Sequence, residues 1–129
     1  MADLERPGPA EIRLDIPADA RHVATARLVA ASAGVDAGLN LDELDDVRLG
    51  IDELAALLVA RAGAGARLTI TAEVQPGRLV LHGGLDGAVD PRADPSDALS
   101  ERIVAAVADH YELGEHTFRL EKSATDGGG

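Results

Sequence analysis

The sequence contains no cysteine and no tryptophan, and it has only one tyrosine, Tyr111, and one phenylalanine, Phe118. A chain without cysteine has no disulfide, no thiol nucleophile and no thiolate metal site. Because these aromatic types make up 2% of 129 residues, the chain lacks the stacking platforms that bind nucleic-acid bases and sugars. These absences exclude redox chemistry by the side chains and argue against a base-stacking site.

Positive charge is also scarce, because 12 Lys and Arg stand against 23 Asp and Glu, for a formal net charge of −11 at pH 7. An acidic surface repels phosphate backbones and anionic membranes and attracts basic proteins. The sequence contains no apolar run long enough to cross a bilayer and no basic start followed by an apolar stretch. We therefore expect a soluble cytoplasmic protein that contacts neither nucleic acid nor membrane, with a basic protein as its charged partner.

The sequence does contain enough hydrophobic residues, 46%, to build one aliphatic core without cross-links. Proline and glycine mark both ends of the chain, where no periodicity is found. We expect a flexible segment at 1–10, a single domain at 11–122 and a disordered tail at 123–129.

The spacing of apolar residues predicts the elements of that domain. Alternation predicts strands at 11–16, 66–74, 78–83 and 116–122, the middle two forming a hairpin around 75–77. Steps of three and four predict a helix from Ala18 to a C-cap near Gly34, with Asp19 as N-cap, and a second helix after Asn40. A loop at 83–95 leads to a third helix that carries Leu99, Ile103, Val107 and Tyr111 on one face. We expect an α/β two-layer sandwich, with about three helices on one face of a mixed sheet of four or more strands.

Few residues suggest chemistry by their spacing. The four histidines lie in separate elements without ligand spacing, so no metal site is expected, and no serine stands in a nucleophile elbow. Glu53, in the middle of the second helix, serves either as a general base or as a salt-bridge partner at the helix boundary. The structural role is favoured because charges on helices are usually solvated. The glycines of GGLDG, from Gly83 to Gly87, follow a strand where nucleotide sites often lie, but they match no established fingerprint.

Four stretches together resemble a known family. These are LDIPADARHVATARLVAASAG (14–34), LNLDELDDVRLGIDELAALLVARA (39–62), LSERIVAAVADHYEL (99–113) and HTFRLEK (116–122), with a hairpin and a glycine-containing loop between the second and the third. This order is similar to that of the RsbW-type anti-sigma factors, which belong to the GHKL superfamily with the histidine kinase-like ATPase fold, and DVRLGIDEL resembles their actinobacterial branch. The resemblance implies a cytoplasmic regulator, often dimeric, that sequesters an alternative sigma factor until an anti-anti-sigma factor competes for it.

The resemblance also implies where ATP and magnesium would bind in an active member. The family's catalytic glutamate matches Glu53, but the asparagine that holds magnesium is replaced by Leu57, which offers no oxygen. In the adenine-binding motif, Gly83 stands at the aspartate, and only Gly87 keeps the family's glycine. The stretch 97–104 lacks the glycines of the third motif. We expect a degenerate nucleotide site with no bound metal; the alternative is an active ATP-dependent serine/threonine kinase of an anti-anti-sigma factor.

Overall fold

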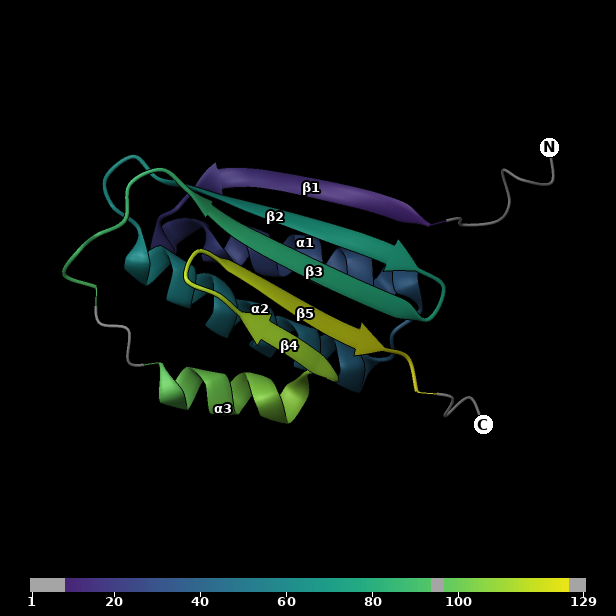
Figure 1. Cartoon of the computed structure of the whole chain (residues 1–129). Helices are drawn as coiled ribbons and strands as arrows, with labels where there is room; N and C mark the ends of the chain where they lie inside the picture. The colour runs from purple at the N-terminus through teal and green to yellow at the C-terminus, as the bar shows by residue number, and fades with distance from the viewer. Residues whose placement is uncertain (1–8, 94–96, 126–129) are drawn as a thin grey trace.

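The computed structural model describes residues 9–93 and 97–125, and it shows an α+β fold of two layers (Figure 1). Five strands form one sheet in the order β1-β2-β3-β5-β4, and three helices lie against one face of it. Along the chain the elements are β1 (Ala10–Pro17), the 3-10 helix η2 (Ala20–His22), α1 (Val23–Ala37), α2 (Leu41–Arg61), β2 (Arg67–Gln75), β3 (Arg78–Asp86), α3 (Ala98–Val107), β4 (His110–Leu113) and β5 (Thr117–Ser123). The two-layer sandwich predicted from the sequence is confirmed.

The sequence predicted a mixed sheet, and this prediction is wrong. All four strand pairings are antiparallel. The helices α1 and α2 run out and back, so the chain returns to the sheet at the end where β1 finished, and β2 runs opposite to β1. A single helix, α3, connects β3 to β4, which usually gives parallel neighbours. Here β5 inserts between β3 and β4 and pairs antiparallel with both.

The core lies between the sheet and α2. Along β2 every second residue is buried, which places one apolar face of the sheet against the helices. The helix α2 contributes Ile51, Leu54 and Leu58, all fully buried. Phe118 is the only large aromatic side chain in an otherwise aliphatic cluster of the described residues. The opposite face of the sheet carries mainly polar and charged side chains and is not covered by any described helix (Figure 1).

The first helix extends one turn beyond the predicted C-cap. Gly34 lies buried inside α1, where a Cβ atom would stand 2.7 Å from Leu44 Cδ2 of α2. It is therefore a glycine of close helix–helix approach. The helix ends at Gly38, whose φ of 89° is left-handed and whose N–H donates to the carbonyls of Gly34 and Val35. Asp19 caps η2 by accepting from the Arg21 N–H, as its position before the helical residues predicted.

The second helix begins with a capping box, in which the Asn40 side chain accepts from the Glu43 N–H and the Glu43 carboxylate accepts from the Asn40 N–H. Glu43 is the only buried charged side chain among the described residues. The N–H groups of Asn40 and Thr125 donate to its carboxylate and lower its pKa. The start of α2 is thus tied to the segment that follows β5.

Two boundaries in the second half of the chain differ from the sequence prediction. β3 continues to Asp86, three residues into the predicted loop. The third helix ends at Val107, and Tyr111 belongs to β4, opposite Leu120 of β5. Tyr111 satisfies the helical spacing from Val107 and also the two-residue alternation with Leu113, and the pairing with β5 decides in favour of the strand.

The predicted ends of the domain are close to those of the sheet. Ala10 and Ser123, which the sequence placed in the terminal segments, are the first residue of β1 and the last residue of β5. Of the segments predicted to be flexible or disordered, 1–10 and 123–129, residues 1–8 and 126–129 lie outside the described residues, as do residues 94–95 of the predicted loop. None of the helices in the described ranges is long and apolar enough to cross a membrane.

Candidate functional site

The helix α2 carries Glu53 and Leu57, the two positions that the resemblance matches to a catalytic glutamate and a magnesium-binding asparagine. Glu53 is half-buried in the middle of the helix. Leu57 lies one turn further on and is only 7% exposed, as a member of the hydrophobic core. The neighbouring Asp52 forms an ion pair with Arg27 of α1, with 2.8 Å between Nε and Oδ1. The position that would need an oxygen ligand for magnesium is therefore occupied by a core leucine.

Gly83 of β3 and Gly87, just after it, are the positions that the resemblance matches to an adenine-binding aspartate and a glycine. A Cβ atom on Gly83 would meet the ring of Phe118, with Cδ2 at 2.6 Å and Cε2 and Cζ closer still. Phe118 is 3% exposed and lies opposite Gly83 in the pairing of β3 with β5. The space that a side chain at residue 83 would need is filled by this ring, so glycine is required here by packing.

Gly87, which the resemblance matches to a glycine of the motif, also has a structural explanation. Its φ of 106° lies in the region that favours glycine, and a Cβ atom would stand 3.2 Å from the Cα atom of Ala66. Just beyond it, Val89 forms a bridge with Ala62, the residue after α2. Gly87 thus lets the chain turn from β3 back across the end of α2.

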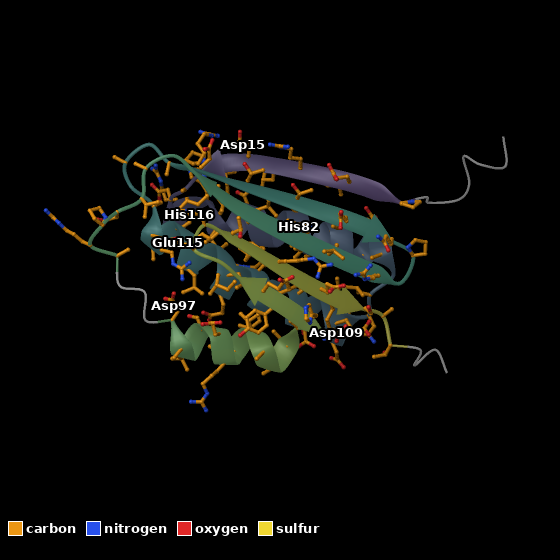
Figure 2. All side chains as sticks on the ribbon, in the orientation of Figure 1. Asp15, His82, Asp97, Asp109, Glu115 and His116 are labelled. Atoms are coloured by element: carbon orange, nitrogen blue, oxygen red, sulfur yellow. The ribbon has the colours of Figure 1, made fainter. Side chains whose placement is uncertain are left out.

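Arg61, the last residue of α2, joins three segments that are far apart in the sequence. Its Nη1 atom donates to the carbonyl oxygens of Gly114 and Glu115 at 2.9 and 3.0 Å, and its Nη2 atom lies 2.6 Å from Oδ2 of Asp97. The Arg61 and Asp97 side chains are 14% and 11% exposed. Figure 2 shows Asp97 at the start of α3 and Glu115 in the turn between β4 and β5. The sequence does not predict this cluster, because Arg61 lies at least 36 residues from each of its partners along the chain.

A cavity of about 490 Å³ lies beside this cluster, between the end of α2, the chain after β3 and the β4–β5 turn. Four of its lining residues are acidic and one is Arg61; the acidic ones are Asp90, Asp97, Glu101 and Glu115. An excess of carboxylates disfavours a polyanion such as a triphosphate. Glu53, Leu57, Gly83 and Gly87 are not among its lining residues, so the structure does not bring the family-matched positions together in this cavity.

The open face of the sheet contains a network of ion pairs. Arg119 donates to Glu121 at 2.5 Å, and Arg78 donates to the other carboxylate oxygen of Glu121. These hydrogen bonds lower the pKa of Glu121 to about 2. On the same face His82 Nε2 lies 3.3 Å from Glu73 Oε2 (Figure 2). A cavity of about 390 Å³ lies beside His82 and Arg119, and its lining residues also include Gly83, Glu112 and Phe118.

Metal-ligating side chains do not gather in the described part of the chain. No group of three or more His, Asp or Glu side chains there has a geometry that could hold a metal ion. The four histidines lie in separate places, in η2, β3, β4 and the β4–β5 turn. The described residues therefore supply no candidate metal centre.

The outer face of the helical layer combines exposed apolar side chains with acidic ones. Leu28 and Val35 of α1 are 71% and 61% exposed, and their spacing of seven residues places them on one side of the helix, opposite the buried Ala26 and Ala30. On α2, Leu49 is 43% exposed. Exposed acidic residues also occur on the two helices, at Asp36, Asp42 and Asp45, and Asp45 forms an ion pair with Arg48, with 2.7 Å between Oδ1 and Nη1. We call these six residues, Leu28, Val35, Asp36, Asp42, Asp45 and Leu49, the outer helical face.

Comparison of the sequence with models of protein families and with curated proteins finds no match.

Proposed function

We propose that this protein is a cytoplasmic regulator of the anti-sigma-factor type, which binds an alternative sigma factor and keeps it from RNA polymerase. In this proposal an anti-anti-sigma factor competes for the regulator and releases the sigma factor. The nucleotide site of the GHKL fold is degenerate, so sequestration by binding, rather than phosphorylation, is the activity.

The order of the elements supports this proposal. The chain runs from a strand through two helices and a hairpin to a loop, a helix and a closing strand, which is the order that the resemblance implies. The structure adds the short strand β4 before the last one. The fold alone does not select a function, since one fold serves many.

The outer helical face is the observation that carries the proposal. Contiguous exposed apolar patches often mark sites of protein–protein contact, and we propose that the apolar side chains of the outer helical face form one. Here Leu28 and Val35 would supply the apolar contact, while Asp42 and Asp45 would attract a basic partner and speed its association. Such a surface fits a basic, amphipathic helix of a transcription factor.

The positions matched to the nucleotide motifs support the degenerate site. Leu57 is packed in the core, and the place of the adenine-binding aspartate is taken by Gly83 against the ring of Phe118. Each of these residues has a packing role that explains its identity without a nucleotide. Glu53 would be the base of an active kinase, and no described oxygen ligand stands at Leu57 to place magnesium beside it.

Titration of the protein with the purified sigma factor encoded nearest to its gene tests the proposal. We expect a stoichiometric complex whose affinity falls as salt rises, because exposed charges are screened over about 10 Å at 0.1 M ionic strength. The variant Leu28→Asp/Val35→Asp should weaken binding at least about tenfold. Leu99→Asp is the matched control, since Leu99 of α3 is also 71% exposed but lies away from the outer helical face.

Two outcomes would overturn the proposal. The first is the absence of binding to that sigma factor and to the other alternative sigma factors of the same organism. The second is a complex that both variants weaken equally, because the outer helical face would then have no special part in it. The degenerate site is tested separately with a non-hydrolysable ATP analogue. Tight, magnesium-dependent binding of the analogue would overturn the degenerate site. Phosphorylation of an anti-anti-sigma factor by ATP, abolished by Glu53→Gln, would establish the kinase instead.

A further inference from the structure

Residues 123–125, at the end of β5 and just after it, are fastened to the domain through their backbone N–H groups. We call these three residues the strap. Their acceptors lie in segments far apart in the sequence: the junction of α3 and β4, where Figure 2 labels Asp109, the β2–β3 turn, and the first turn of α2. The three bonds run from Ser123 to Oδ2 of Asp109 at 2.6 Å, from Ala124 to the carbonyl oxygen of Gly77 at 2.8 Å, and from Thr125 to Oε2 of Glu43 at 2.6 Å.

The side chains of the strap are small and anchor it weakly. That of Ala124 packs against the core, and Thr125 is exposed. Ordering the backbone of three residues costs conformational entropy of the same size as the gain from three such hydrogen bonds. The closed strap is therefore only slightly favoured over an open one, as is typical of segments that open locally while the fold persists.

Lys122, the residue before the strap, is fixed more firmly. Its Nζ atom donates to the carbonyl oxygen of Val107 at 2.8 Å and to Oδ2 of Asp46 at 2.9 Å, and its side chain is 12% exposed. Breaking these contacts would leave a nearly buried ammonium group without partners, which is costly. An opening motion is therefore confined to the residues that follow Lys122.

Glu43 links the strap to the start of α2. One oxygen of its carboxylate, Oε1, accepts from the Asn40 N–H at 2.8 Å within the capping box, and the other, Oε2, accepts from the Thr125 N–H. The Glu43 side chain is 5% exposed. When the strap opens, Oε2 loses the Thr125 donor, and a buried carboxylate with an unsatisfied oxygen is unfavourable. The side chain is then drawn toward water, away from the position in which Oε1 caps Asn40.

We propose that the strap is a conformational switch, which opens and closes on the folded domain and, when closed on Glu43, fixes the first turn of α2. The coupling is reciprocal, so a change that loosens the first turn of α2 also frees the strap. The switch itself does not depend on the proposed function. Its consequence for binding does rest on that function: Asp42 and Asp45 of the outer helical face lie in the first two turns of α2, and a closed strap holds them in place for a partner.

Hydrogen exchange followed by NMR tests whether the strap opens by itself. In the unchanged protein the amide protons of the strap should exchange at least about a hundredfold faster than that of Leu81, in the middle of β3, which is released only when the fold opens. Low concentrations of urea should speed the exchange of Leu81 but not that of the strap, because opening the strap exposes little surface.

The variant Thr125→Pro tests whether the strap acts as one unit coupled to α2, because proline has no N–H to donate to Glu43. Thr125→Ala is the matched control, since it removes the same side chain and keeps the N–H. We expect the Ser123 and Ala124 amide protons to exchange at least about tenfold faster in Thr125→Pro than in Thr125→Ala. The Glu43 N–H, which donates to the Asn40 side chain at 2.8 Å, should also exchange at least about threefold faster.

The variant Glu43→Gln tests the coupling from the other side. A carboxamide offers one acceptor oxygen, so it cannot accept from both the Asn40 and the Thr125 N–H. At least one of these two amide protons should therefore exchange faster than in the unchanged protein. Asp86→Asn is the control for the charge, because Asp86 is exposed at the far end of β3 from the turn that holds the strap.

Strap amides that exchange as slowly as Leu81 would overturn the switch, since the strap would then open only with the whole fold. So would a Thr125→Pro variant in which the strap is freed while the Glu43 amide exchanges as in Thr125→Ala, because the two would then be uncoupled. The consequence for binding is refuted if the two Thr125 variants bind the sigma factor equally well. If the unchanged protein does not bind it, the proposed function fails, and the exchange measurements still decide the switch.

Discussion

Gly83 and Gly84 are adjacent on β3, yet an alanine at each should have opposite consequences. A Cβ atom at residue 83 would overlap three carbons of the Phe118 ring, all nearer than 3 Å, whereas carbon atoms in contact prefer about 3.5–4.0 Å. The ring is 3% exposed and belongs to the hydrophobic core. Overpacking of this kind costs typically about 1–3 kcal/mol. Because a rigid ring takes the whole overlap, we expect Gly83→Ala to destabilise the protein by about 3 kcal/mol.

Gly84 is the matched control on the other face of the sheet. A Cβ atom there meets nothing within 4 Å. We expect Gly84→Ala to change the free energy of unfolding by less than about 0.5 kcal/mol, or to raise it slightly because alanine reduces the freedom of the unfolded chain. Urea denaturation followed by far-ultraviolet circular dichroism measures both values, since the protein lacks tryptophan.

A third variant identifies the ring as the cause. Phe118→Leu replaces the planar ring with a smaller side chain, so the double variant Gly83→Ala/Phe118→Leu should lose at least about 1 kcal/mol less than the sum of the two single losses. If Gly83→Ala is as stable as Gly84→Ala, or if the two losses simply add, the packing argument is refuted. The explanation of why glycine, and no larger residue, stands at position 83 would then also be refuted.

Two further predictions concern charged groups. Arg61→Ala should lower the free energy of unfolding, measured by urea denaturation, by about 3 kcal/mol, because it leaves the 11%-exposed Asp97 carboxylate without its partner. The double variant Arg61→Ala/Asp97→Ala should recover part of that loss. A change below about 1 kcal/mol in Arg61→Ala would show that the cluster does not stabilise the fold. Arg119 and then Arg78 lower the pKa of Glu121 from 4.5 to about 2, so the carboxylate stabilises the fold above about pH 5 and this contribution is lost as the pH falls toward 2. In Glu121→Gln the free energy of unfolding should therefore fall less steeply between about pH 5 and pH 2 than in the unchanged protein. The same pH dependence in both proteins would contradict the role of the network.

The sequence predicts the elements of this fold well where one periodicity is unambiguous. The 21 residues of α2 have a capping box and a long apolar stripe, and β2 alternates without a break. The prediction is wrong where two patterns overlap, as at Tyr111, which fits both a helix and a strand. It is also wrong at Gly34, because a glycine that allows two helices to approach has the same one-letter signature as a glycine that ends a helix.

The candidate site is harder to predict, since its contacts join distant parts of the chain. Arg61 is recognisable in the sequence only as a cation at the negative end of a helix, and its three partners become visible only in the folded chain. The overlap of Gly83 with Phe118 depends on the register between β3 and β5, which the pattern of either strand alone leaves open. Sequence spacing identifies which residues differ from a motif, and packing explains why they differ.

That explanation bears on what the protein can do. At an intact nucleotide site, polar groups must be held at the surface of a cavity, at a cost in stability that ligand binding offsets. Here Leu57 and the glycine–phenylalanine contact at residue 83 belong to the core instead, at positions that the resemblance matches to nucleotide-binding residues. With those positions packed in the core, the outer helical face is the surface on which we propose that a partner binds. A protein of this construction should act through what it binds there, and its thermal stability should rise with a protein partner and not with ATP and magnesium.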